Sequence, residues 1–186
     1  MIDKILINGR AGSGKDVFAD YLVEKYGFKK ITFADGIYDI AYKYFGMTYK
    51  DRGLLQAIGE KMREINPLVW VNYTLKVAEH YDKVVISDCR RANEYDFLLE
   101  KGFLPIHIEA DLGLRIKRLE ERDGFYPDLS LLENKSETGA DGLDFIDVDN
   151  NNTTHELYRQ IDKIMETDWN KTIKELQMKF TLRQIY

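Results

Sequence analysis

Short apolar runs rich in β-branched residues alternate along the chain with longer segments in which apolar residues recur at helical spacing. This alternation is typical of βαβ units around a parallel sheet. Runs at residues 2–7, 28–33, 84–87 and 103–108 predict four strands, and a weaker run at 145–148 predicts a fifth. The pattern therefore predicts an α/β fold with three layers, α/β/α, and a central five-stranded parallel sheet.

Helical spacing predicts helices between and after these strands, at residues 54–65, 68–78, 92–99, 157–165 and 170–186. Pro67 separates the first two, and it can occupy the first turn of the second. The least hydrophobic stretch, 120–142, contains Gly and Pro residues typical of an excursion from the core. We expect a single domain over residues 1–186, with a lid-like excursion near 111–142 and a helical tail over 156–186.

A glycine-rich segment follows the first predicted strand and opens a helix: Gly9-Arg10-Ala11-Gly12-Ser13-Gly14-Lys15-Asp16. This is the pattern G-x-x-x-x-G-K in its required context. Glycines let backbone N–H groups turn inward toward phosphate oxygens, and the lysine supplies a charge for the β- and γ-phosphates. Chance produces this spacing in about 5% of chains of this length, and the strand and helix around it make chance less plausible. The segment predicts a nucleoside triphosphate site, which we call the phosphate loop.

Asp16 stands where this pattern usually has Ser or Thr, whose hydroxyl coordinates Mg²⁺. A carboxylate can serve the metal directly or through water, because Mg²⁺ prefers oxygen ligands and keeps several waters. The alternative is that Asp16 only favours the first turn of its helix, as acidic residues do.

A second acidic residue, Asp88, ends the buried strand at 84–87, where ligands gather in open α/β sheets. An acid in this place holds magnesium or its water shell in nucleotide-binding sheets, and Arg90 could hold a phosphate. The alternative for both residues is a surface salt bridge.

Three arginines, Arg115, Arg118 and Arg122, fall within about 60° of one another on a helix at 100° per residue. In a kinase such a stripe belongs to a lid that closes over the triphosphate. The alternative is a solvated face, because acidic residues cancel its charge locally: Asp111, Glu120, Glu121 and Asp123.

Composition narrows the class of partner. The 186 residues carry 27 Lys and Arg against 32 Asp and Glu, a net charge of −5, which argues against nonspecific binding of polymeric nucleic acid. A single cysteine, Cys89, fits a reducing compartment. Without a targeting signal or an apolar segment of membrane length, we expect a cytoplasmic protein that does not bind membranes.

Other candidate chemistry is sparse. The three histidines are widely spaced and are expected to be structural or surface residues. Aromatic residues near the second strand, among them Tyr42, Tyr44 and Phe45, could stack on a base, although core packing is the expected role for most aromatic residues.

Taken together, these motifs resemble the phage-type deoxynucleoside monophosphate kinases, a P-loop family that phosphorylates dNMPs with ATP. The resemblance covers most of residues 2–165 and rests on the order and spacing of short matches. These are Ser13-Gly14-Lys15-Asp16, Phe33-Ala34 leading to Gly46, residues 52–59 and 70–72, Asp88-Cys89-Arg90 with Glu94, Ser136-Glu137, and 150–153 before Glu156-Leu157. Asp16 is thus a mark of that family.

The resemblance implies a role for each matching residue. The phosphate loop and Lys15 would bind ATP phosphates, Asn150 would lie near the adenine, and Asp16 and Asp88 would serve Mg²⁺. The expected catalytic residues are Lys15, Asp88 and Arg90, together with Arg118 and Arg122 of the arginine stripe. The implied acceptor-binding residues are Asp35, Arg52, Gln56, Trp70, Asp88, Arg90 and Glu94.

The chain also departs from that family. Members often have Pro-x-Lys where this chain has Gly36-Ile37-Tyr38, so Tyr38 cannot supply the lysine's charge and the base preference is expected to differ. Cys89-Arg90-Arg91-Ala92 differs from the commoner aliphatic residue followed by Arg-Phe-Pro.

The resulting hypothesis is transfer of the γ-phosphoryl group from ATP to a (deoxy)nucleoside monophosphate, with Mg²⁺, in a bacterial or phage-infected cell. The expected partners are small nucleotides, and a homodimer is compatible with the sequence. One alternative is a P-loop kinase of another phosphorylated acceptor, of the dephospho-coenzyme A or isoprenoid-phosphate type. The other is a nucleotide-binding regulatory module without turnover.

Overall fold

A parallel five-stranded sheet forms the centre of the protein, as seen in a computed structural model that describes residues 2–127 and 139–185. The strand order is β2-β3-β1-β4-β5, and every described pairing is parallel. The strands are β1 (Lys4–Asn8), β2 (Lys29–Ile31), β3 (Val84–Ile86), β4 (Leu104–Glu109) and β5 (Ile146–Asp149). The prediction of a parallel five-stranded α/β fold of the P-loop type is confirmed.

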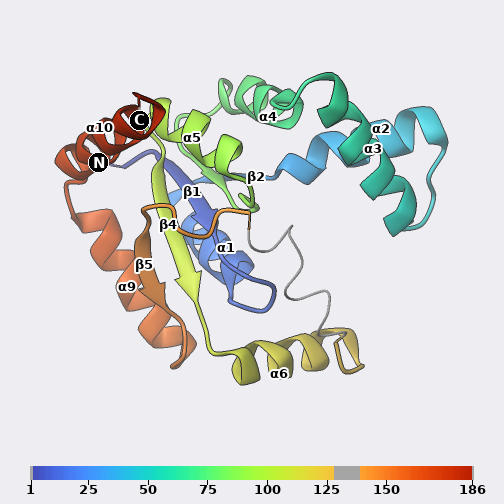
Figure 1. Ribbon diagram of the computed structural model, residues 1–186. Helices are drawn as coiled ribbons and strands as arrows, with labels where there is room; N and C mark the ends of the chain where they lie inside the picture. The colour runs from blue at the N-terminus through green and yellow to red at the C-terminus, as the bar shows by residue number, and fades with distance from the viewer. Residues whose placement is uncertain (1, 128–138, 186) are drawn as a thin grey trace.

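Helices cover both faces of this sheet (Figure 1). They are α1 (Lys15–Tyr26), α2 (Phe33–Phe45), α3 (Arg52–Ile65), α4 (Val69–Ala78), α5 (Ala92–Glu100), α6 (Leu112–Asp123), α9 (Thr154–Glu166) and α10 (Asn170–Ile185). Because α4 begins at Val69, Pro67 precedes that helix and does not occupy its first turn.

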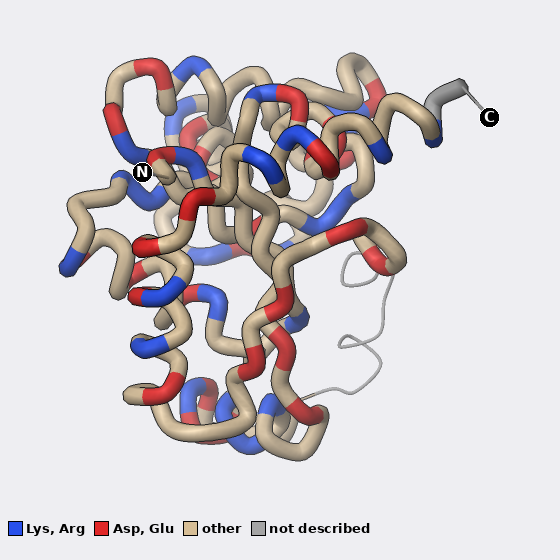
Figure 2. Tube along the Cα trace, turned by 90° about the vertical axis from the view of Figure 1, so that its left-hand side faces the viewer, with Lys and Arg blue, Asp and Glu red and all other residues tan. Residues whose placement is uncertain are grey.

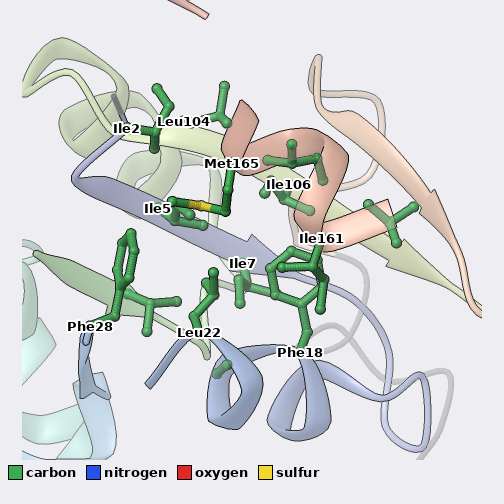
Figure 3. Close-up of a cluster of buried hydrophobic side chains, with 14 of the residues drawn as sticks. Ile2, Ile5, Ile7, Phe18, Leu22, Phe28, Leu104, Ile106, Ile161 and Met165 are labelled. Carbon is green, nitrogen blue, oxygen red and sulfur yellow. The ribbon is translucent and has the colours of Figure 1, made fainter. Parts of the chain in front are cut away.

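Alternate residues of β1 enter two separate cores. Ile5 and Ile7 pack with Phe18 of α1 and Ile161 of α9 on one face (Figure 3). Leu6 packs on the other face, in a cluster that includes residues from α2, α3, α4, α5 and α10. A strand buried on both faces reads as a continuous apolar run, which is why the Ile5–Ile7 run was recognisable in the sequence.

The helix α2 was not predicted, and the strand expected at 28–33 is wrong at its C-terminal end. Thr32 caps α2: its hydroxyl accepts from the N–H of Asp35 at 3.2 Å, and the Asp35 carboxylate accepts from the N–H of Thr32 at 2.9 Å. This capping box ends β2 at Ile31 and places Phe33 in the first turn of the helix.

The expected lid-like excursion at 111–142 is only partly described. Its first part forms α6, whereas residues 128–138, which include the Ser136-Glu137 match, lie outside the described residues. The expected tail at 156–186 corresponds to α9 and α10, and α10 packs against α5.

Acidic and basic residues are interspersed along the chain (Figure 2). Within residues 2–127 and 139–185, no helix is both long and apolar enough to cross a membrane.

Candidate functional site

The phosphate loop connects the C-terminal end of β1 to α1 in a conformation that requires glycine. Gly12 and Gly14 have φ angles of +78° and +101°, which residues with a side chain rarely adopt. A Cβ on Gly12 would lie 2.6 Å from the carbonyl oxygen of Arg115, and one on Gly14 would collide with the side-chain amide of Asn150. The loop is therefore confined by α6 and by the chain after β5.

Inside the loop, two side chains are suited to phosphate oxygens. The Lys15 ammonium donates to the loop's own carbonyls, those of Gly9 and, at 2.9 Å, Arg10. The Ser13 hydroxyl is buried and has no hydrogen-bond partner among the residues that the structure describes. A buried hydroxyl without a partner is destabilising, and a phosphate oxygen would supply one. The loop thus fits a polyphosphate.

Asp16 lies in the first turn of α1, and its side chain is 76% exposed and paired at 2.8 Å with Lys30 of β2. No group of three or more His, Cys, Asp or Glu residues suited to a metal ion occurs within the described ranges. Mg²⁺ at a nucleotide is commonly held by one or two carboxylates together with phosphates. The assignment of Asp16 and Asp88 to Mg²⁺ stays a prediction.

Two arginines of α6 contact the phosphate loop from outside. Arg115 is buried and donates through Nε to the carbonyl of Ala11 at 2.8 Å. Arg118 donates to the carbonyls of Gly12 at 3.4 Å and Asn150 at 2.9 Å. The alternative of a solvated face is therefore wrong for these two residues.

The third arginine of the stripe, Arg122, is exposed and paired with Asp123 at 2.7 Å. Asp123 raises the pKa of Arg122 through that hydrogen bond, and Asp16 adds a smaller contribution. The pKa of Asp123 is lowered mainly by Arg122 and to a smaller extent by Arg52. The end of α6 is thus within electrostatic reach of both the start of α1 and the start of α3. The lid role of α6 stays a prediction.

A cavity of about 230 Å³ lies between α2, α3 and the turn after β3. We call it the arginine pocket; its lining consists of Phe33, Ala34, Ile37, Glu60, Arg63, Asp88, Arg90, Arg91 and Glu94. Cys89, in the turn after β3, links the chain that lines this pocket to the end of β1, directly before the phosphate loop: its N–H donates to the carbonyl of Ile7 at 3.2 Å, and its carbonyl accepts from the Asn8 side chain at 2.8 Å. Both sites therefore lie at the same edge of the sheet.

Asp88 caps the N-terminus of α2 from within the arginine pocket. Its two carboxylate oxygens accept the N–H groups of Phe33 at 2.9 Å and Ala34 at 3.2 Å. Burial raises the pKa of Asp88 to about 7, with a smaller contribution from the Glu94 carboxylate, against the opposing effects of the two N–H groups and Arg90. Asp88 thus gains and loses its proton near neutral pH.

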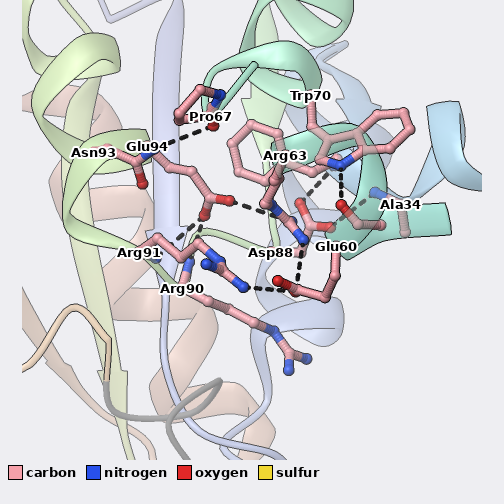
Figure 4. Close-up of polar contacts among 12 residues, drawn as sticks. Ala34, Glu60, Arg63, Pro67, Trp70, Asp88, Arg90, Arg91, Asn93 and Glu94 are labelled. Atoms are coloured by element: carbon pink, nitrogen blue, oxygen red, sulfur yellow. Dashed lines mark hydrogen bonds and ion pairs between the residues drawn. The ribbon is translucent and has the colours of Figure 1, made fainter. Parts of the chain in front are cut away.

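Carboxylates hold the arginines of the pocket in a network (Figure 4). Glu60 pairs with Arg63 at 3.2 Å and with Arg91 at 2.7 Å, and Glu94 pairs with Arg63 at 3.6 Å. Glu94, only 3% exposed, also accepts the N–H groups of Arg90 and Arg91 at 3.0 and 3.2 Å. In Figure 4 the Arg90 side chain extends away from the pair of Glu60 and Arg91. Glu94 therefore shapes the turn that presents Arg90.

Sequence reasoning missed Glu60, Arg63 and Arg91. Glu60 and Arg63 lie eight and eleven residues after Arg52 on α3, so the helical period that starts at Arg52 could have identified them. Arg91 appeared only as a departure from a family pattern.

Four residues expected to bind the acceptor lie outside the lining of the arginine pocket. Asp35 is engaged in the capping box of α2. Trp70 is buried in the core, where its indole N–H donates to the carbonyl of Gly59 at 3.2 Å. Arg52 and Gln56 are exposed on α3. Tyr42, Tyr44 and Phe45 are exposed by 53%, 79% and 60%, so core packing does not account for them, and their stacking on a base stays a prediction.

Two solved structures share this fold. TT1252 from Thermus thermophilus is 14% identical with a TM-score of 0.58, over 90% of this chain and 100% of that chain. Shikimate kinase from Acinetobacter baumannii, in complex with shikimate, is 16% identical with a TM-score of 0.54, over 89% of this chain and 92% of that chain. At these identities the likeness shows a shared fold and nothing further.

Two curated relatives come from Ictalurid herpesvirus 1 (strain Auburn). Uncharacterized protein ORF76 is 34% identical over 53% of this chain and 44% of its own length, and uncharacterized protein ORF77 is 31% identical over 72% and 57%. The chain thus spans about half the length of these relatives. Residues 5–138, more than half of the chain, match the family described as AAA domain. With a phosphate loop at the required edge of a parallel sheet, the chain belongs to the AAA domain family.

Proposed function

We propose that this protein transfers the γ-phosphoryl group of ATP to a (deoxy)nucleoside monophosphate bound in the arginine pocket. The observation that carries the proposal is the placement of an arginine-lined cavity beside a phosphate loop, joined to it through Ile7, Asn8 and Cys89. Arginine is suited to phosphate because its planar fork donates two hydrogen bonds at once. The nucleoside monophosphate as acceptor rests on the motif resemblance.

The inventory of side chains suits phosphoryl transfer, which depends on positioning and positive charge and needs no nucleophilic side chain. An oxygen of the acceptor phosphate attacks the γ-phosphorus while the bond to the β-phosphate oxygen of ADP breaks. An ionised acceptor phosphate has no proton to lose in this step. In the proposed mechanism Lys15 and the loop N–H groups hold the donor, and Arg90 holds the acceptor. Mg²⁺, with Asp16 or Asp88 as ligand, would neutralise phosphate charge.

Replacing Lys15 tests the donor half of this proposal. We expect Lys15→Ala to reduce kcat/KM at least about 100-fold, as the loss of one preorganised charge-stabilising donor does in other enzymes. Lys4→Ala, at the opposite end of β1 and exposed, is the matched control and should keep wild-type turnover. Near wild-type turnover by folded Lys15→Ala protein would contradict the assignment.

An acceptor panel tests the other half. ADP release is measured with Mg²⁺–ATP and each common ribonucleoside and deoxyribonucleoside monophosphate, and with dephospho-coenzyme A and an isoprenoid phosphate. Turnover with a monophosphate supports the proposal. Turnover with only one of the other phosphates assigns a different acceptor, and nucleotide binding without transfer to any acceptor favours a regulatory module.

Asp88 favours a second candidate, a kinase of a small alcohol. A carboxylate with a pKa of about 7 is suited to accept the proton that an attacking hydroxyl loses. Shikimate kinase, whose fold is similar, was solved with shikimate bound. Shikimate and a simple sugar acid therefore join the panel. Turnover with either of them, and with none of the monophosphates, favours this candidate.

A further inference from the structure

Three consecutive carbonyl groups on the outside of the phosphate loop accept hydrogen bonds from the C-terminal half of the chain. The carbonyl of Ala11 accepts from Arg115 at 2.8 Å, that of Gly12 from Arg118 at 3.4 Å, and that of Ser13 from the Nδ2 of Asn150 at 2.7 Å. The donors come from α6 and from the turn after β5. This side of the loop is therefore held by elements about a hundred residues away.

The orientation of a carbonyl fixes the N–H of the next residue, because the peptide unit is planar and trans. With the carbonyls of Ala11 and Ser13 held outward, the N–H groups of Gly12 and Gly14 point to the opposite, concave side of the loop. A concave arrangement of N–H groups is what binds phosphate oxygens. The contacts of Arg115 and Asn150 thus favour the loop conformation that binds a polyphosphate. The N–H that follows the Gly12 carbonyl, that of Ser13, instead donates within the loop to the carbonyl of Arg10 at 3.0 Å.

Asn150 is placed rigidly for this contact. It is 5% exposed, its N–H donates to the carbonyl of Glu109 at 2.8 Å, and its carbonyl accepts from Arg118 at 2.9 Å. Its side-chain amide lies against the α-carbon of Gly14, which leaves no room there for a side chain. The amide is therefore directed at the back of the phosphate loop.

We infer that Asn150 is a positioning residue, which acts on the donor's phosphates through Ser13 and Gly14 and makes no contact with the base. Arg115 acts in the same way through Ala11 and Gly12, and Arg118 supports the loop at the carbonyl of Gly12. This differs from the place near the adenine that the motif resemblance implied for Asn150. The inference rests on the proposed function only in that the phosphate loop binds a polyphosphate.

A pair of ligands with and without a base tests this inference. Binding of ATP and of inorganic tripolyphosphate, each with Mg²⁺, is measured by calorimetry on wild type, Asn150→Ala and Asn152→Ala. Asn152 is exposed in the same turn and bonds to the side chain of Asp149, so its variant is the matched control. We expect Asn150→Ala to weaken both ligands by the same factor, roughly tenfold, as loss of one hydrogen bond to a buried group does.

The outcomes distinguish a positioning role for Asn150 from a contact with the base. Weakened ATP binding with unchanged tripolyphosphate binding would show a base contact and overturn the inference, and so would unchanged binding of both ligands. If Asn150→Ala does not fold, Asn150→Leu keeps the approximate size of the side chain and removes the donor without adding a charge, with the same expected equal loss. Wild-type protein that binds neither ligand refutes the donor site and this inference together. Binding without phosphoryl transfer refutes only the transfer.

Discussion

Asp88 makes the stability of the fold depend on pH in a direction that can be measured. Its carboxyl group has a pKa of about 7 in the folded protein, against an ordinary value of 3.8. Because the folded state holds the proton more tightly, the group contributes full stability below about pH 4 and loses it as the pH rises through about 7. The substitution Asp88→Asn removes this titration.

The two pKa values set the size of the effect. They differ by about 3, and each unit corresponds to about 1.4 kcal/mol, so ionisation of Asp88 lowers the free energy of unfolding by up to about 4 kcal/mol. Asparagine has one carboxamide oxygen, so the variant keeps only one of the hydrogen bonds from Phe33 and Ala34. That loss of about 1 kcal/mol is the same at every pH and does not alter the slope.

Urea unfolding at a series of pH values between about 4 and about 8 measures this difference. We expect the wild type to lose stability relative to Asp88→Asn as the pH rises, by up to about 4 kcal/mol over the series. The pKa of Glu94 is also raised, mainly by burial, but its contribution cancels to first order in the comparison because both proteins retain it. Asp82→Asn, on the exposed turn before β3, should follow the wild-type profile. Parallel profiles for wild type and Asp88→Asn would refute the reasoning.

Two further predictions concern the loop and the pocket. Gly12→Ala should abolish nucleotide binding, because its Cβ would lie 2.6 Å from the carbonyl oxygen of Arg115. The control Gly113→Ala, whose Cβ would have no atom within 4 Å, should bind nucleotide normally. Calorimetry measures both affinities, and retained binding by Gly12→Ala would contradict the packing argument. Arg63→Met should destabilise the fold by about 3 kcal/mol in urea unfolding, because it removes the ion pair between Arg63 and the buried Glu94 carboxylate. Adding Glu94→Gln should restore at least half of that loss, and an unrelieved double variant would show that the charge is not the cause.

The elements with strong periodicity were predictable because one physical signal dominated each. β1 is buried on both faces and reads as a continuous apolar run, and the glycines of the phosphate loop have a spacing that few other structures require. The helix α2 was not predicted, because its start depends on a capping box between Thr32 and Asp35, a local hydrogen-bond pattern that the spacing of apolar residues does not reveal. Asp35 was expected to bind the acceptor for the same reason: the sequence pattern did not reveal that its carboxylate caps α2.

Three features were predictable from the sequence alone: a parallel α/β fold, the position of the phosphate loop, and an acidic residue with an arginine at the end of β3. Each of these depends on residues close together in the chain. Contacts between distant side chains became known from the folded structure: those of Asn150 and Arg118 at the back of the loop, and those of Glu60, Arg63 and Glu94 around the arginine pocket. Such contacts depend on how the helices pack on the sheet and on what burial does to a charge, and neither is local to a stretch of sequence.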